Sequence, residues 1–228
     1  IAGSVDIIGF LGLNGLFIAH ITGNLVVLAA RIVAGDPAPV SYIISVPVFV
    51  AALLLTRLLV ACLDRVQVAS LVPLLLVQFL LLSGFLSIGV IAGHRENPHA
   101  AIMIFAGMLG VAAMAVQNAL VKISLPEAPS TAVATTNTVV LTMDIGTILL
   151  SRDPKGIASA RGRAGNTWPA VAGFLAGCII GGAGESLIGL RSLAFPVSLS
   201  LLALFMGIAC NRRRLPGELK KHSDDACV

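Results

Sequence analysis

The chain has 228 residues, of which 57% are hydrophobic and 11% charged, with a formal net charge of +4 and a mean hydropathy of +0.98. Soluble domains carry roughly 25% charged residues, so this composition excludes an ordinary water-soluble fold and predicts a membrane protein with the lipid bilayer as its main partner. No nucleic acid partner is expected, because the basic residues form short clusters between long apolar runs, as membrane-side anchors do.

Apolar runs long enough to cross the hydrocarbon core predict an all-α, polytopic transmembrane bundle of eight helical segments. In chain order they cover residues 1–12, 18–34, 40–62, 69–92, 98–122, 132–150, 166–189 and 192–210. The first segment starts inside an apolar stretch without a Met, which predicts that this helix is truncated. The second is marginal, so the first two can also form one broken span, giving seven crossings instead of eight.

Polar or Pro- and Gly-containing breaks separate these segments. They fall at 35–37, 64–65, 94–98, 126–130 and, the longest, 151–165. We expect a single transmembrane domain over residues 1–211 and a basic cytoplasmic tail over 212–228. With eight crossings, the side of the tail collects eleven Lys and Arg residues against four on the other side, in agreement with the positive-inside rule.

An internal repeat relates the two halves of the chain. TGNLVVLAARI from Thr22 matches TTNTVVLTMDI from Thr135 at an offset of 113, and residues 5–7 match 117–119 at an offset of 112. The repeats would be A, residues 1–92, and B, residues 98–211. Four plus four helices would give both repeats the same orientation, and three plus three would invert one of them. We favour four plus four, because the fifth segment, the partner of the first, is long enough to span.

Polar residues stand at matching places in the two repeats, where a carboxylate or amide is followed by a turn and a helix that opens with Thr-Gly-Asn or Thr-Thr-Asn. They can cap that helix, or they can form a polar pocket between the repeats that accepts an anionic group. The candidate substrate-binding residues are Asp6, Asn14, His20, Thr22, Asn24, Gln117, Asn118, Thr135 and Asn137.

Two ionisable pairs also suggest hypotheses. Asp6 and His20 lie among apolar residues, where charge is costly and signals a partner or a function; His20 is either a proton relay or a hydrogen-bonding residue. Arg31 and Asp144 occupy equivalent positions and are candidates for an ion pair between the repeats, unless Arg31 reaches the lipid headgroups.

Glycines recur every four residues in the seventh segment, at Gly173, Gly177 and Gly181. This spacing favours close helix packing, either within the chain or in a homo-oligomer. Enzyme and metal motifs such as GxSxG, HExxH, a P-loop or a close cysteine pair are missing, so we expect no enzyme, no metal site and no cofactor.

The stretches AGSVDIIGFLGLNGLFIAHITGNLVVLA, VQNALVK and TTNTVVLTMDIGTILL resemble the YoaK-like family of bacterial polytopic membrane proteins of unknown function, over essentially the whole chain. Ile7 and Asn137 depart from the Ala and Gly that are common in that family. The resemblance implies a multi-pass protein of the bacterial inner membrane and implies no activity.

The duplication favours a small-solute permease-like transporter with a polar site between the repeats, carrying a small polar or anionic solute. The alternative is a membrane scaffold or assembly partner that packs through the glycine-rich helix. An intramembrane enzyme built on Ser4, Asp6 and His20 is the third hypothesis.

Overall fold

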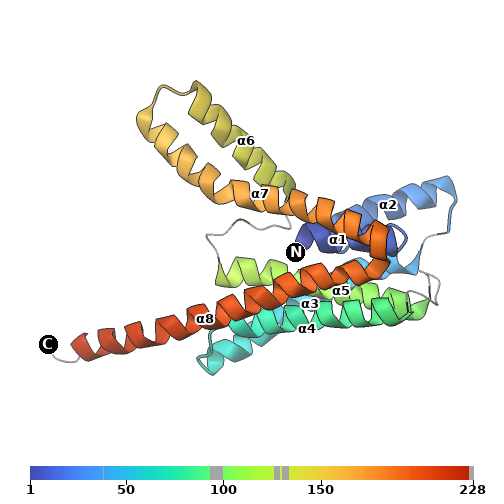
Figure 1. Ribbon diagram of the computed structural model, residues 1–228, viewed down its shortest axis with the longest axis horizontal. Helices are drawn as coiled ribbons and strands as arrows, with labels where there is room; N and C mark the ends of the chain where they lie inside the picture. Colours follow the sequence, from blue (N-terminus) through green and yellow to red (C-terminus); the bar gives the residue numbers. More distant parts are fainter. Residues whose placement is uncertain (38, 93–99, 126–128, 130–133, 226–228) are drawn as a thin grey trace.

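The computed structural model describes residues 1–37, 39–92, 100–125, 129 and 134–225, with side chains as far as residue 211. In this part of the chain all regular structure is helical (Figure 1), as predicted. The α-helices are α1 Ala2–Gly12, α2 Ile21–Ala34, α3 Val40–Arg65, α4 Leu71–Ala92, α5 Ala101–Ser124, α6 Ala134–Leu150, α7 Pro154–Ile188 and α8 Ala194–Asp225, with a 3-10 turn, η1, at Gly189–Leu193.

Four helical stretches of the described residues are long and apolar enough to cross a membrane: α3, α4, α5 and the stretch Pro154–Asn211 that joins α7 to α8. The helices α1, α2 and α6 are apolar but shorter, with 11, 14 and 17 residues. Large apolar side chains such as Leu54, Leu55 and Leu58 point away from the bundle. An outer surface of this kind is stable in lipid and not in water, so the fold is that of a helical membrane protein.

Helices α4 and α5 pack along each other, with α3 on the far side of α5 and α8 against α4. Helix α7 packs against α1 with one part and against α6 with another, and the α6–α7 pair projects from the bundle (Figure 1). Helix α2 packs against α3. The core lies where α1, α4 and α5 enclose large buried side chains such as Phe85, Met103 and Ile8.

Helices α4 and α8 run in opposite directions. Gly89, near the end of α4, lies against Leu190 and Leu193, which directly precede α8. Gly207, well along α8, lies against Leu75 near the start of α4. In the predicted four-plus-four arrangement, α4 and α8 are equivalent helices and run in the same direction. Because they are antiparallel, the predicted parallel orientation of the repeats is wrong.

The reversal comes from the segment between α1 and α2. Residues 13–20 turn back beside α1, so that a Cβ at Gly9 would lie only 2.3 Å from the Ile18 side chain. Helix α2 then leaves in the same direction as α1 (Figure 1). The two short helices therefore make one broken passage, which is the alternative that the sequence left open.

Helix α7 begins much earlier than predicted. The Asp153 carboxylate accepts hydrogen bonds from the backbone N–H groups of Lys155 (3.1 Å) and Gly156 (2.9 Å), and Pro154 occupies the first turn. Both are strong helix-start signals, so most of the predicted loop 151–165 is helical. Helix α8 also continues to Asp225, through most of the predicted tail. The predicted breaks at 94–98 and 126–128 lie outside the described residues.

Positive charge gathers at one end of the bundle, which we call the basic end. It is the end where α3 and α5 finish and α4 begins, and where the Ser70 and Ser124 hydroxyls lie 3.0 Å apart. Basic residues of the described helices lie towards it, namely Arg57, Arg65, Lys122, Arg152, Lys155, Arg161 and Arg163. Arg31, at the end of α2, and Arg191, in η1 beside the end of α4, lie at the opposite end.

Candidate functional site

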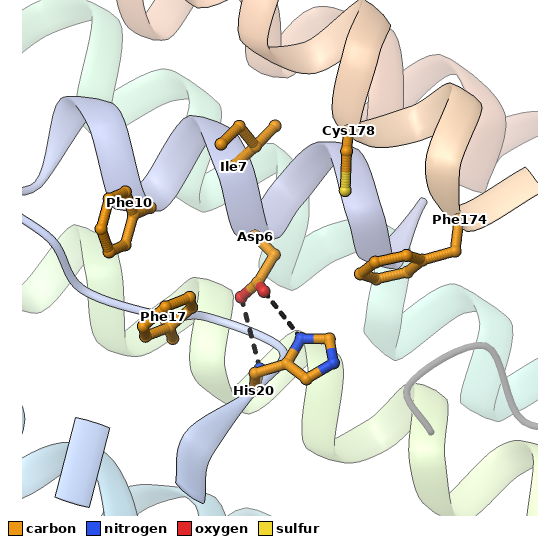
Figure 2. A pocket seen from close by; sticks show the side chains of 7 residues that line it. All are labelled: Asp6, Ile7, Phe10, Phe17, His20, Phe174 and Cys178. Carbon is orange, nitrogen blue, oxygen red and sulfur yellow. Dashed lines mark hydrogen bonds and ion pairs between the residues drawn. The ribbon is translucent and has the colours of Figure 1, made fainter. Parts of the chain in front are cut away.

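The Asp6 carboxylate on α1 holds the segment that leads into α2. One of its oxygens accepts hydrogen bonds from the backbone N–H groups of Ile18 (2.8 Å), Ala19 (2.7 Å) and His20 (3.3 Å). The other oxygen lies 2.7 Å from the Nδ1 atom of His20 (Figure 2). Backbone N–H groups outside a helix must find acceptors at membrane depth, and a carboxylate also suits the partial positive charge at the start of α2. Each oxygen of the buried Asp6 carboxylate therefore has a partner, the backbone N–H groups for one and the His20 ring for the other.

Asn24 and Asn14 have structural roles in the same segment. The Asn24 amide donates to the Phe17 carbonyl (2.8 Å) and to the Ser45 hydroxyl (3.1 Å), and its oxygen accepts from the Phe17 N–H (2.9 Å). The Tyr42 hydroxyl donates to the Asn14 carbonyl (2.7 Å) at the turn after α1. The Asn24 side chain therefore makes hydrogen bonds that hold the segment before α2, whereas Asn14 contributes a backbone carbonyl.

A first cavity of about 380 Å³ lies between α1, the segment 13–20 and α7 (Figure 2). It is lined by Asp6, Ile7, Phe10, Phe17, His20, Phe174 and Cys178. The Phe174 ring stands edge-on to the His20 imidazole, with 5.3 Å between the ring centroids. Apart from the Asp6–His20 pair the lining is apolar and aromatic.

A second cavity, of about 530 Å³, lies between the start of α2, α3 and α5. Its polar lining consists of His20, Thr22, Arg57, Asn118 and Lys122, and its apolar lining includes Phe49, Leu53 and Ile123. His20 lines both cavities. His20, which pairs with Asp6, therefore lies between an acidic, aromatic cavity and a basic one.

The linings of the two cavities correspond by position. The α1 residues of the first cavity, Asp6, Ile7 and Phe10, precede the α5 residues of the second, Asn118, Ala119 and Lys122, by 112 positions each. The α7 residues of the first, Phe174 and Cys178, follow the α3 residues of the second, Phe49 and Leu53, by 125 positions each. Two helix pairs therefore present matching positions to two separate cavities.

The remaining predicted site residues are not in either cavity lining. The Gln117 side chain accepts a hydrogen bond from Gln78 on α4 (2.8 Å). Thr135 is exposed and Asn137 is buried on α6, which packs against α7. The structure therefore brings His20, Thr22 and Asn118 together but leaves the second Thr-Thr-Asn motif apart from them.

The predicted pair of Arg31 with Asp144 is wrong. Buried Asp144 binds Arg163 in a two-pronged arrangement that includes a 3.1 Å hydrogen bond from Nε. The guanidinium of Arg31 instead lies 5.7 Å from the centre of the Tyr42 ring. Helices α6 and α7 form a hairpin, so Arg163 comes close to Asp144 through local geometry, while Arg31 stands at the far end of the bundle.

Truncation of Arg163 to Ala is expected to destabilise the α6–α7 hairpin by about 1.5–3 kcal/mol, since it leaves the Asp144 carboxylate buried without its charged donor. The double change Asp144→Leu and Arg163→Leu should recover most of that loss. The midpoint of thermal unfolding in detergent measures both, with Arg161→Ala as the exposed control on the same helix. An equal effect of Arg161→Ala would contradict the assignment.

Two of the three predicted packing glycines contact α1. A Cβ atom at Gly177 would meet the Ser4 backbone at 3.1 Å, and one at Gly181 would meet it at 2.8 Å. Gly173 has open space beside it. At Gly177 and Gly181 the glycine face therefore lies against α1 of the same chain.

The residues for the third hypothesis do not form a catalytic triad. The Ser4 hydroxyl donates to the Ile1 carbonyl (2.9 Å), whereas Asp6 and His20 bond to each other. No group of three or more metal-ligating His, Cys, Asp or Glu residues occurs among the described residues.

Sequence reasoning missed Arg57 and Lys122 as site residues. Both side chains are exposed, and basic residues near the ends of apolar helices are typical of interfacial anchors. A signal was present, because Leu53 and Arg57 on α3, and Asn118 and Lys122 on α5, are spaced by one helical turn and so share a face.

A helical bundle with membrane-length helices and a broken passage held by a buried carboxylate defines a polytopic helical membrane protein. A family model described as "Protein of unknown function (DUF1275)" matches residues 1–206, and the chain belongs to this family. That membership is consistent with the resemblance to YoaK-like proteins. No curated protein and no solved structure gave a significant match.

Proposed function

We propose that the protein is a permease-like transporter of a small polar or anionic solute, and that the second cavity is its solute site. The observation that carries this proposal is a cavity of about 530 Å³ at the start of a helix that begins inside the bundle, lined by polar groups from three helices. Transporters commonly bind solutes at such broken helices.

The arrangement of the two halves supports the proposal, which includes an inverted duplication. If α1, α2 and α3 are taken as equivalent to α5, α6 and α7, the same helix contacts occur twice. The packing of α2 on α3 then corresponds to that of α6 on α7, and the packing of α3 on α5 corresponds to that of α7 on α1. The same equivalence maps the first cavity onto the second, through the spacings of 112 and 125 positions. With α4 and α8 antiparallel, the axis that relates the halves lies in the membrane plane, which is the symmetry found in many secondary transporters.

The location of His20 suits an alternating mechanism. A solute in one cavity is separated from the other by a boundary that includes this imidazole. Inverted repeats that rock around a fixed boundary expose the two cavities in turn.

We also propose that the protein resides in the bacterial inner membrane with its basic end in the cytoplasm. Cytoplasmic ends of membrane proteins are enriched in Lys and Arg, and Arg65, Arg152 and Lys155 lie at the basic end. The long α8 also leads its C-terminus there (Figure 1).

Transport is tested with purified protein in proteoliposomes, by measuring uptake of labelled organic acids, amino acids and sugars. Leu53→Trp places a bulky ring in the second cavity and is expected to reduce uptake at least about tenfold, because the ring occupies space needed by the solute. Leu54→Trp is the matched control, since Leu54 is 62% exposed and faces outwards.

Uptake no greater than in protein-free liposomes for every solute would overturn the proposal. So would equal uptake by the Leu53→Trp and Leu54→Trp variants, provided both elute as monodisperse protein.

A scaffold role is the second candidate, supported by the open helix face at Gly173, one turn before the α1 contact at Gly177. Such a face can hold another helix. Crosslinking in native membranes tests it, and a defined oligomer lost in Gly173→Leu is the expected outcome. An intramembrane enzyme has less support, because Ser4 is engaged by the Ile1 carbonyl.

A further inference from the structure

We propose that the second cavity binds the anionic, oxygen-bearing group of a small solute, a carboxylate or a phosphate, between Arg57 and Lys122. The inference rests on the proposed function, for which it specifies the class of substrate.

The two cations reach the cavity from different helices. Arg57 lies on α3 and Lys122 on α5, and these helices pack together with the cavity at their contact. A guanidinium offers a planar fork of donors and an ammonium a compact charge, a combination suited to a carboxylate or phosphate.

No carboxylate of the described chain neutralises this pair. The described ion pairs are those of His20 with Asp6 and of Arg163 with Asp144. None of the polar residues that line the second cavity is acidic. An anion entering the cavity therefore meets positive charge that no carboxylate of the described residues compensates.

The start of α2 also faces the cavity, next to the His20 N–H group whose hydrogen bond Asp6 accepts. Ile21 and Thr22 line the cavity, and no side chain caps the helix at His20. The first N–H groups of a helix lack intrahelical acceptors and carry partial positive charge.

The matching positions of the first cavity show the contrast. Asn118 and Lys122 correspond there to Asp6 and Phe10, so one cavity has a carboxylate and an aromatic ring where the other has an amide and an ammonium. The same backbone arrangement thus carries opposite electrostatics, which confines anion binding to the second cavity.

The test measures the shift in unfolding midpoint on titration of purified protein in neutral detergent, at constant ionic strength, with sodium phosphate, sodium succinate or choline chloride. Phosphate or succinate is expected to raise the midpoint, because a ligand that binds only the folded state stabilises it. Arg57→Gln and Lys122→Gln should each weaken that binding by about tenfold or more. Arg65→Gln, an exposed change on α3 outside the cavity, should leave it unchanged.

Arg57→Lys keeps the charge and replaces Arg57→Gln in the test if that variant fails to fold. It should bind the anion more weakly than wild type and more strongly than Arg57→Gln. A parallel arm adds phosphatidylglycerol to the detergent. Stabilisation by the lipid but by neither soluble anion would assign the site to a headgroup and overturn the solute proposal. The same would follow if choline stabilised equally, or if Arg65→Gln weakened binding as much as Arg57→Gln.

The two proposals fail separately. One outcome is uptake of a neutral solute that Leu53→Trp blocks, with no shift of the unfolding midpoint by anions. This outcome rules out an anionic substrate but supports transport. The other outcome is anion binding that is lost in Arg57→Gln, with no uptake of any solute. This outcome rules out transport but supports the anion site.

Discussion

Replacement of Asp6 by Ala is expected to destabilise the protein more than truncation of any other polar side chain in the described structure. The carboxylate accepts hydrogen bonds from three consecutive backbone N–H groups and pairs with His20. Each buried donor left without a partner costs about 1–3 kcal/mol, so we expect a loss of at least about 3 kcal/mol. The fraction of protein that remains monodisperse after heating in detergent measures it.

Two variants sharpen this prediction. Asp6→Asn keeps one oxygen as an acceptor and should fall between wild type and Asp6→Ala. Asp36→Ala removes an exposed carboxylate just after α2 and should stay within about 0.5 kcal/mol of wild type. Equal stability of Asp6→Ala and Asp36→Ala would show that Asp6 does not hold the segment.

Alanine at Gly3 or Gly181 is expected to separate α1 from α7. A Cβ at Gly3 would lie 2.3 Å from the Phe174 carbonyl oxygen, and one at Gly181 would lie 2.8 Å from the Ser4 Cα atom. Both neighbours are backbone atoms, which move only if a whole helix moves, and overpacking of this kind costs about 1–3 kcal/mol. The unfolding midpoint in detergent should fall accordingly for either variant.

Gly173→Ala provides the matched control on α7, two helical turns before Gly181. Its Cβ would meet nothing within 4 Å, and the change removes a flexible glycine from a helix, worth up to about 1 kcal/mol of stabilisation. A midpoint for Gly173→Ala below that of Gly181→Ala would contradict the packing described for α1 and α7.

The helices themselves could be predicted because apolar runs of membrane length are a strong signal. Their directions could not, since the turn at residues 13–20 depends on hydrogen bonds that Asp6 and Asn24 make with backbone groups far along the chain. Such contacts leave no periodicity in the sequence. The start of α7 was missed for a different reason: polar residues such as Arg161 and Arg163 resemble a loop by hydropathy, although Asp153 and Pro154 form a regular helix start.

The site was predictable in part. Asp6 and His20 stand out because ionisable groups among apolar residues need partners, and the structure joins them. The pairing of Arg31 with Asp144 failed because Asp144 bonds Arg163 within the α6–α7 hairpin, while Arg31 lies over the Tyr42 ring. Arg57 and Lys122 gather at one cavity only through the packing of α3 on α5.

The imidazole of His20 has one further consequence, because it belongs to two chambers at once. The residue lines both chambers, and its ring is tethered by Asp6 to the entry of α2. We therefore expect an occupant that displaces this residue from one side to change the affinity for an occupant on the other side, and linkage makes the two effects equal. Under the proposed transport, such coupling would let uptake on one side promote release on the other.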